Sequence, residues 1–508
     1  MKTPARFAAQ SEQIMSIDFL FQWLKRFGVY LLLMGLFILH LQFLTCDPAL
    51  NFCGSRGPFT DEGLYLFQLR NYLNGHGFNL YSADTVLKSP LFSLLFFLPL
   101  KIVGIHLFTA RFFALLFCFV PLLFAAGQRN LKGLVSVMVP MVFLEPFIFQ
   151  YTHYSLAEMI GCCWIFCGLV FNFRYYASGS FNDLIIGTLI FLLVFILKIQ
   201  FIYILTIPIL SIGYICAKKY LVFAQRKSLL HFLFLIGIIS IAMIAFNLVW
   251  YQPNKAFFNS VVKQPYKLPN SWNEIWTNMK FNYEHVLLND DLRLLTKSFY
   301  LFLTIGIFFL LPFKTSKEFK FLFSVCVLWI GIELHKLSFS YIPIRYLIPL
   351  LFAAVLLISL VVNESIQIAY KERNKIKYIL PIFTVLASLN LAYQNLSHLK
   401  SLMAERTYVM HDLTNYIKQT IQNDGIIAGN WAPSLTWEVP NETMVVVSGV
   451  LNDEKMFTSI KPVAVSEEED EADSDGAFKN RGIDLAQKSD SIKHAKIGRW
   501  NLNIFRIK

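Results

Sequence analysis

The chain has 508 residues, of which 56% are hydrophobic and only 15% are charged, and its mean hydropathy is +0.52. Soluble domains carry about 25% charged residues, so this composition excludes a water-soluble globule of this length. The net charge of +12 comes from Lys and Arg residues gathered between hydrophobic runs. That distribution is the positive-inside pattern of membrane proteins, and we expect no nucleic-acid partner.

The first hydrophobic run covers residues 27–46 and follows four basic residues. We therefore expect an uncleaved first span with the N-terminus in the cytoplasm. The next apolar segment, 91–106, is short and contains Pro99, Lys101 and Gly104. Every later basic loop falls in the cytoplasm only if this segment lies at the outer surface or dips in and returns, so we favour that arrangement.

Apolar runs of bilayer-spanning length predict about 11 transmembrane helices in an all-α bundle. An odd number of crossings places loops 47–107 and 251–295 and the C-terminal region outside. We therefore expect a transmembrane domain over 1–399, with juxtamembrane helices in its outer loops. The predicted spans are 27–46, 108–127, 133–150, 155–173, 182–199, 200–217, 229–250, 296–313, 320–336, 345–362 and 376–394.

The composition becomes more polar from about residue 400, which predicts a small extracytoplasmic α/β domain over 400–508. We expect an amphipathic helix over 405–423, with strands at 426–428 and 444–447. A final strand or hairpin is expected over 496–507. The acidic run from Glu467 to Asp475 predicts a solvated loop.

The cysteines and paired acids give no metal-ligand pattern. Six of the eight cysteines lie in apolar runs, and we expect them to be buried as small hydrophobic side chains. Cys46 and Cys53 flank a short outer segment, and a disulfide between them is left open. We predict that Asp290 and Asp291 mark the start of a helix. A metal site is less favoured, because no further ligands accompany them.

Adjacent acids, Asp61 and Glu62, stand near the start of a predicted helix in the first outer loop. Thr60 is expected to be the N-cap of that helix. One alternative is that the two acids only complement the helix dipole. The other is that they face an aqueous pocket and carry chemistry.

Three cations, Arg111, Lys198 and Arg345, stand at or near the ends of apolar spans, where an unpaired charge is costly. Our topology places all three at the outer boundary, where together they would bind a phosphate. The alternative is that each side chain snorkels toward lipid headgroups.

Further polar residues near the same level are less specific. His335 and Lys336 precede Arg345 in one outer turn and could join the cation layer, although a lone interfacial His is more often structural. Glu158 stands near an outer helix start, where it either orients a substrate or caps the helix.

Five short motifs occur in an order that resembles the GT-C glycosyltransferases. The resemblance is closest to the branch that contains protein O-mannosyltransferases, the lipid A aminoarabinose transferase and lipopolysaccharide galacturonosyltransferases. Leu87 and Ser89 depart from the "KPPL" element of that branch, where an acid and a proline are usual. The matching motifs are Asp61-Glu62, Lys88-x-Pro90 with Ala110-Arg111, the acid at Glu158, Phe195 to Lys198, and Arg345-Tyr346 to Pro349.

The resemblance implies an inverting membrane glycosyltransferase that takes a sugar from a polyprenyl-phosphate donor. Asp61 would be the base and Glu62 its helper, while Lys198 and Arg345, with neighbouring Tyr346, would hold the carrier phosphate. Lys88 and Arg111 would support the donor or the Asp61 helix.

The resemblance also bears on partners, cofactors and location. The acceptor would be an envelope glycolipid, glycan or protein. A requirement for a divalent metal is left open, because metal dependence varies in this superfamily. The expected location is a bacterial inner membrane, with the site and the C-terminal domain facing the periplasm. A lipid-linked sugar transporter and a non-catalytic scaffold are the alternatives from other classes.

Overall fold

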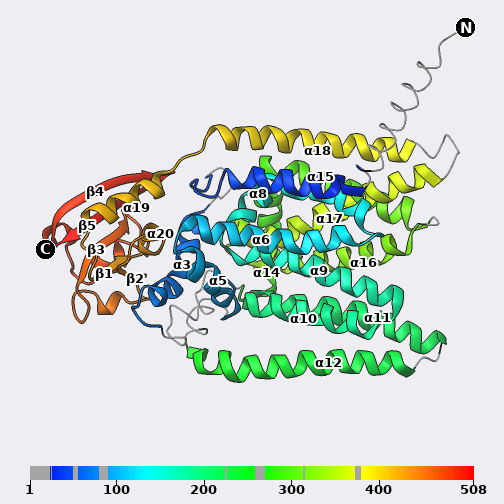
Figure 1. Ribbon diagram of the computed structural model, residues 1–508, viewed down its shortest axis with the longest axis horizontal. Helices are drawn as coiled ribbons and strands as arrows, with labels where there is room; N and C mark the ends of the chain where they lie inside the picture. Colours follow the sequence, from blue (N-terminus) through cyan, green and yellow to red (C-terminus); the bar gives the residue numbers. More distant parts are fainter. Residues whose placement is uncertain are drawn as a thin grey trace, which may run out of the picture.

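Apolar helices run side by side along most of the chain, and a small mixed sheet lies beyond one end of them (Figure 1). This computed structural model describes residues 23, 26–49, 55–78, 90–223, 226–256, 258, 269–312, 315–371 and 379–508. The predicted class, an all-α membrane bundle with a small C-terminal α/β domain, is confirmed.

The bundle is built from long apolar helices that pack around α17, in which 89% of an apolar stretch of 18 residues is buried. A first helix, Arg26–Leu41, precedes the labelled ones. The others are α3 (Gly57–Leu73), α5 (Pro90–Val103), α6 (Leu107–Gly127), α7 (Lys132–Phe143), α8 (Pro146–His153), α9 (Ala157–Ser178), α10 (Phe181–Leu197), η1 (Ile199–Leu205), α11 (Thr206–Phe223), α12 (Arg226–Phe246), α14 (Trp272–Asn282), α15 (Asp290–Ile305), α16 (Lys317–Glu333), η6 (Leu334–Ser338), α17 (Ile344–Lys371) and α18 (Ile379–Ala404).

Eight helices in the described part of the chain are long and apolar enough to cross a membrane, or up to nine if the bent pair α7 and α8 forms one span. The helix Arg26–Leu41 and α10, which cover two further predicted spans, are apolar but shorter. Each predicted span therefore falls on an apolar helix, while the number of crossings stays a prediction. The short helix α5 covers the segment that we expected at the membrane surface, and its orientation also stays a prediction.

The bundle has two distinct ends, separated by about the thickness of a bilayer. Arg345 begins α17 at the end beside α3, which we call the domain end, and Glu364 lies near the C-terminus of α17. At 1.5 Å per residue, the 19 residues between them span about 28 Å, close to the hydrocarbon thickness of a membrane.

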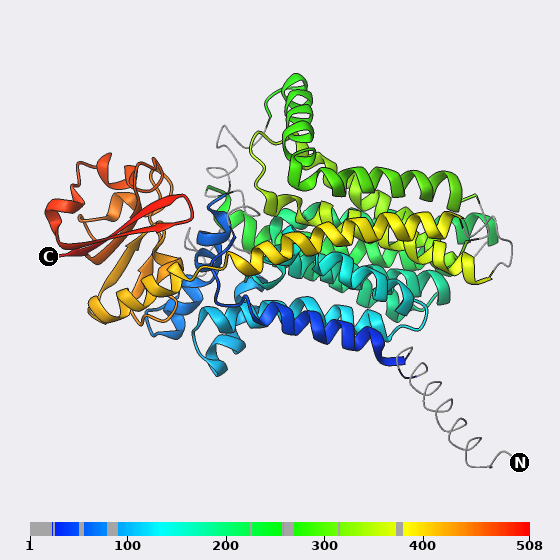
Figure 2. The same cartoon turned by 90° about the horizontal axis from the view of Figure 1, so that it is seen from above.

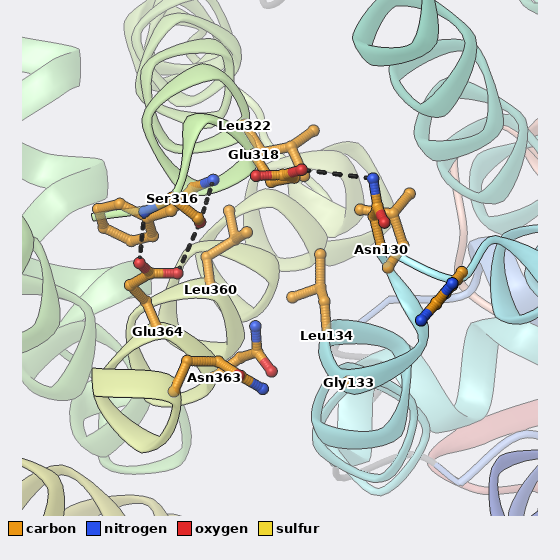
Figure 3. A pocket seen from close by; sticks show the side chains of 13 residues that line it. Asn130, Gly133, Leu134, Ser316, Glu318, Leu322, Leu360, Asn363 and Glu364 are labelled. Carbon is orange, nitrogen blue, oxygen red and sulfur yellow. Dashed lines mark hydrogen bonds between the residues drawn. The ribbon is translucent and has the colours of Figure 1, made fainter. Parts of the chain in front are cut away.

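A polar hollow of about 260 Å³ lies at the end opposite the domain end (Figure 3). Glu364 there accepts hydrogen bonds from the amide and hydroxyl of Ser316, at 2.7 and 2.8 Å, and thereby supports the start of α16. Asn130 and Glu318 also line this hollow, and the Asn130 side chain donates a hydrogen bond to the Glu318 carboxylate at 3.4 Å.

The C-terminal domain contains a five-stranded sheet in the order β2-β1-β3-β5-β4. The first three neighbours in that order pair in parallel, and β5 pairs antiparallel with both β3 and β4. The predicted helix, first strand and final hairpin are confirmed, and the second strand lies two residues earlier than predicted. The elements are α19 (Val409–Thr420), β1 (Ile426–Gly429), α20 (Ala432–Leu435), β2 (Glu442–Met444), η8 (Asp453–Lys455), β3 (Pro462–Glu468), α21 (Gly476–Lys479), α22 (Leu485–Lys488), β4 (Ser489–Ile497) and β5 (Trp500–Ile507).

Helix α3 lies between the bundle and the sheet domain, as both views show (Figures 1 and 2). Its Asn71 exchanges two hydrogen bonds with the backbone of Thr443, at 2.8 and 3.0 Å. The carbonyl of Thr60 accepts from the Ser434 hydroxyl at 3.0 Å. The side of α3 that carries Asn71 therefore docks on the C-terminal domain.

Two local predictions are wrong. Helix α3 begins at Gly57 with Arg56 as its N-cap, because Pro58 starts the helix one turn earlier than Thr60. The acidic run is not entirely a solvated loop, since its first two residues complete β3 and are buried. Arg56 pairs with Glu468 at 2.9 Å, which offsets the cost of burying that carboxylate. Burial, helped by the nearby Asp475 charge, raises the pKa of Glu467 to about 7.

The contact between α3 and α20 predicts an intolerant glycine. A Cβ at Gly63 would lie 2.4 Å from the backbone of Pro433, so Gly63→Ala must push the two helices apart. We expect a destabilisation of about 1–3 kcal/mol, seen as a lower melting temperature of the full chain in detergent. Gly35→Ala is the matched control, because its Cβ would meet nothing within 4 Å. Equal melting temperatures for the two variants would contradict this packing.

Candidate active site

The two predicted acids of α3 point to different partners, because consecutive residues on a helix lie about 100° apart. Asp61 forms an ion pair with Arg345, at the start of α17. Glu62 forms an ion pair with Arg111 of α6. The predicted cations Arg345 and Arg111 are thus both partnered by carboxylates of α3.

The Glu62–Arg111 pair is almost completely shielded from solvent. Arg111 has no exposed surface and Glu62 is 2% exposed. The Nε of Arg111 lies 3.0 and 3.1 Å from the two carboxylate oxygens, and the amide and hydroxyl of Ser155 donate to Oε1 at 2.8 and 3.1 Å. Arg111 also donates to the carbonyl of Cys46 at 2.6 Å. This network joins α3 to α6, to the segment after the first helix and to the turn before α9.

A third ion pair lies at the same end of the bundle, between Lys198 and Glu158. Lys198 is the C-cap of α10, and its Nζ lies 2.5 Å from Oε1 of Glu158 in the first turn of α9. The same Nζ lies 5.4 Å from the ring centre of Tyr346 and 5.9 Å from that of Tyr65. Burial, together with the charge of Glu158, raises the pKa of Tyr65 well above 10. Tyr65 therefore stays protonated at neutral pH.

A fourth ion pair joins Lys336 to Glu333, an acid that the sequence analysis did not single out. Glu333 has no exposed surface, and Lys336 approaches it to 2.6 Å. Glu333 also accepts from the indole of Trp329 at 3.0 Å and from the hydroxyl of Tyr203 at 3.1 Å. A lone acid three residues before a lysine at the end of an apolar span was the available signal.

Three of these four pairs, all except Glu62–Arg111, contribute at least one residue to the lining of a cavity of about 380 Å³ at the domain end of the bundle. Its wall combines charged groups with aromatic rings, which suits a ligand that carries both an anion and a sugar-like ring. His335 also faces this cavity; it is exposed, and its ring lies 4.9 Å from that of Tyr203. The cavity is lined by Glu158, Lys198, Gln200, Phe201, Ile202, Tyr203, His335, Lys336, Phe339, Tyr341, Arg345, Tyr346 and Pro349.

The remaining predicted residues lie elsewhere. Lys88 and Cys53 fall outside the described residues, so the structure gives Lys88 no role and leaves the disulfide untested. Asp290 begins α15, behind an N-cap Asn289 whose side chain accepts from Leu292, which supports the helix-start reading. Within the described residues, no group of three or more His, Cys, Asp or Glu could hold a metal ion.

Sequence comparisons give no relatives, but structural comparisons do. No family model matches the chain, and no curated protein is similar to it in sequence. The crystal structure of ArnT from Cupriavidus metallidurans bound to undecaprenyl phosphate superposes with a TM-score of 0.58 at 11% identity, and the match covers 94% of this chain and 98% of that one. The chain has a GT-C fold. The apo form of the same ArnT gives a TM-score of 0.54 at 12% identity with the same coverage.

The GT-C fold explains how five short motifs that are far apart in sequence meet at one end of the bundle. One cavity is lined by Glu158, Lys198 and Arg345, and Asp61 contacts Arg345. The adjoining buried pair of Glu62 and Arg111 holds α3 to the bundle, and we call this pair the α3 anchor. The predicted cations Arg111, Lys198 and Arg345 thus lie at the domain end of the bundle, and each has a carboxylate partner. The sequence analysis did not identify these carboxylate partners, because the pairing depends on helix packing.

The buried α3 anchor predicts a large, non-additive stability loss. Arg111→Met leaves the Glu62 charge without its counter-ion, and we expect a loss of about 3–5 kcal/mol because an unpaired buried charge is costly. Combining it with Glu62→Gln should recover part of that loss, since the remaining pair is uncharged. Thermal unfolding of both single variants and the double variant in detergent measures this coupling. Additive losses would show that the two groups do not act as a pair.

Proposed function

We propose that the chain is an integral membrane glycosyltransferase that moves a sugar from a polyprenyl-phosphate donor to an envelope glycolipid, glycan or protein. The observation that carries this proposal is the ring of acid–cation pairs around one cavity at the domain end of the bundle. The GT-C fold supports it, because a neighbour with this fold was crystallised with undecaprenyl phosphate.

In this proposal the carrier phosphate binds between Lys198 and Arg345. Both cations line the cavity, and Arg345 also stands at the N-terminus of α17, where the helix dipole favours an anion. The ring of Tyr346 lies 5.3 Å from the Arg345 guanidinium carbon and 5.4 Å from Lys198 Nζ, so it helps to hold the two cations side by side.

Asp61 is the proposed general base. An acceptor hydroxyl attacks the anomeric carbon of the donor sugar, and the bond from that carbon to the phosphate oxygen breaks. The bonding electrons leave with the polyprenyl phosphate, and the hydroxyl proton passes to Asp61. A single displacement of this kind inverts the anomeric centre.

The resting ion pair gives this base a means of activation. While Asp61 is paired with Arg345, the guanidinium stabilises the carboxylate and weakens it as a base. A donor phosphate that takes over Arg345 removes that stabilisation, so Asp61 becomes a stronger base when the donor is bound. The Glu62–Arg111 anchor keeps α3, and with it Asp61, in place during this exchange.

The proposal also includes an orientation of the protein in the membrane. We place the domain end at the outer face of a bacterial inner membrane, because the basic loops gather in the segments that we assign to the cytoplasm.

Replacing the base tests the transferase directly. Asp61→Asn removes the proton acceptor but keeps the side-chain volume, so we expect the transferred sugar to disappear while the protein still folds. Mass spectrometry of envelope glycolipids and glycoproteins compares cells that express the wild type, Asp61→Asn or no protein. Asp290→Asn is the matched control, because this acid is 93% exposed at the start of α15.

Each result has a definite meaning. A sugar-sized mass that requires the wild type and Asp61 supports the proposal. Product formed by Asp61→Asn would refute the assignment of the base. Unchanged envelope molecules, with a lipid-linked sugar that changes leaflet, would favour a transporter instead.

Binding of the carrier lipid tests the phosphate clamp separately. Lys198→Gln and Arg345→Gln each remove one charge-assisted contact worth about 1.5–3 kcal/mol, so each should weaken binding of undecaprenyl phosphate by about 10- to 100-fold. Titration of the purified protein in detergent or nanodiscs measures the dissociation constants. Lys320→Gln is the control, because Lys320 is exposed near the start of α16 at the opposite end. Equal affinities for all variants would exclude this clamp.

A further inference from the structure

Two buried glutamates beside the cavity differ in how fully their oxygens are used. Glu333 is saturated: Oε1 accepts from Trp329, and Oε2 lies within 3.1 Å of the Tyr203 hydroxyl and 2.6 Å of Lys336 Nζ. Glu158 is equally buried at 2% exposure, but only its Oε1 is engaged, by Lys198. Among the described residues, Oε2 of Glu158 has no hydrogen-bond partner.

A buried carboxylate oxygen without a donor is costly and rare in folded proteins. Leaving such a group unsatisfied costs about 1–3 kcal/mol or more for a charged group, so an exception calls for an explanation. Glu158 lines the cavity, so a ligand bound there is the candidate donor for Oε2.

The charge of Glu158 restricts which part of a ligand can approach it. A phosphate would be repelled by the carboxylate and belongs beside Lys198 and Arg345. Hydroxyl and amino groups of a sugar ring donate hydrogen bonds and are the matching chemistry. The aromatic rings of Tyr203, Phe339 and Tyr346 in the same wall suit the apolar face of a sugar.

We propose that Oε2 of Glu158 accepts a hydrogen bond from a hydroxyl or amino group of the donor sugar, so that Glu158 distinguishes a sugar-loaded carrier from bare polyprenyl phosphate. This inference rests on the proposed function, because it needs a lipid-linked sugar in the cavity. Lys198 links the two parts of the ligand, since it pairs with Oε1 of Glu158 and faces the phosphate. Recognition of the sugar and of the phosphate therefore meet at neighbouring atoms.

The test compares two ligands on two variants. Dissociation constants are measured for bare undecaprenyl phosphate and for a panel of undecaprenyl-phosphate-linked monosaccharides, using full-length protein in nanodiscs. The panel includes hexoses, their single-deoxy analogues and sugars with an amino group in place of one hydroxyl. The wild type should prefer at least one sugar-linked lipid over the bare lipid by about 10-fold or more.

Glu158→Gln should reduce that preference by at least about 10-fold, because a neutral amide oxygen is a weaker acceptor and the amide presents its NH2 group to the same space. The affinity of Glu158→Gln for the bare lipid should be equal to or higher than that of the wild type, because Lys198 loses the carboxylate that competes with the phosphate. Retained binding of the bare lipid also shows that the variant is folded. The deoxy analogue that lacks the contacting hydroxyl should bind the wild type and Glu158→Gln equally. Recovery with the amino analogue identifies an amino group as an equivalent donor, and failure to recover identifies the hydroxyl.

Glu333→Gln is the matched control, because it removes an equally buried carboxylate whose oxygens are already occupied by protein donors. It should change the affinity for both ligands by the same factor and so leave the preference unchanged. A Glu158→Gln variant that keeps the wild-type preference overturns the inference, and so does a wild type without any preference. A wild type that binds neither lipid refutes the proposed function itself.

Discussion

Arg111 lies without exposed surface among apolar helices, and its charge is neutralised by Glu62 from a different part of the chain. Charges in such a position are tolerated only as pairs with additional hydrogen bonds, which Ser155 and the Cys46 carbonyl supply. The position of α3 depends on this pair, and Asp61 immediately precedes Glu62 on the same helix. The anchor therefore determines where the candidate base can be.

The other face of α3 is fixed by the C-terminal domain, through Asn71 and the close approach of Gly63 to Pro433. The described residues that line the cavity come from the bundle, while the sheet domain contacts α3. The domain thus acts on the site through α3. The helix is clamped from both sides, which gives Asp61 a defined position although it lies outside the apolar bundle.

Among the described residues, three cations line the cavity, and each is paired with a carboxylate: Arg345 with Asp61, Lys198 with Glu158, which also lines the cavity, and Lys336 with Glu333. Such pairing lowers the free-energy cost of placing charged side chains near the membrane. It also allows a bound anion to replace a carboxylate as the partner of a cation. An incoming phosphate competes with Asp61 for Arg345, while Glu333 keeps Lys336 in place through its further bonds to Trp329 and Tyr203. The proposed site therefore contains one pair that exchanges and one that does not.

The sequence by itself determined the membrane bundle, the positions of the apolar helices and the presence of a C-terminal α/β domain, because hydropathy and periodicity are local properties. It also identified most of the charged residues that gather at the domain end, since a charge beside an apolar run is visible in one dimension. Only the tertiary structure decided the pairing. Glu62 pairs with Arg111 and Asp61 with Arg345. Glu333 forms a further pair with Lys336, and Glu158 pairs with Lys198 through one oxygen while its other oxygen has no hydrogen-bond partner among the described residues. These contacts join residues far apart in the chain, and packing of helices around α17 brings them together.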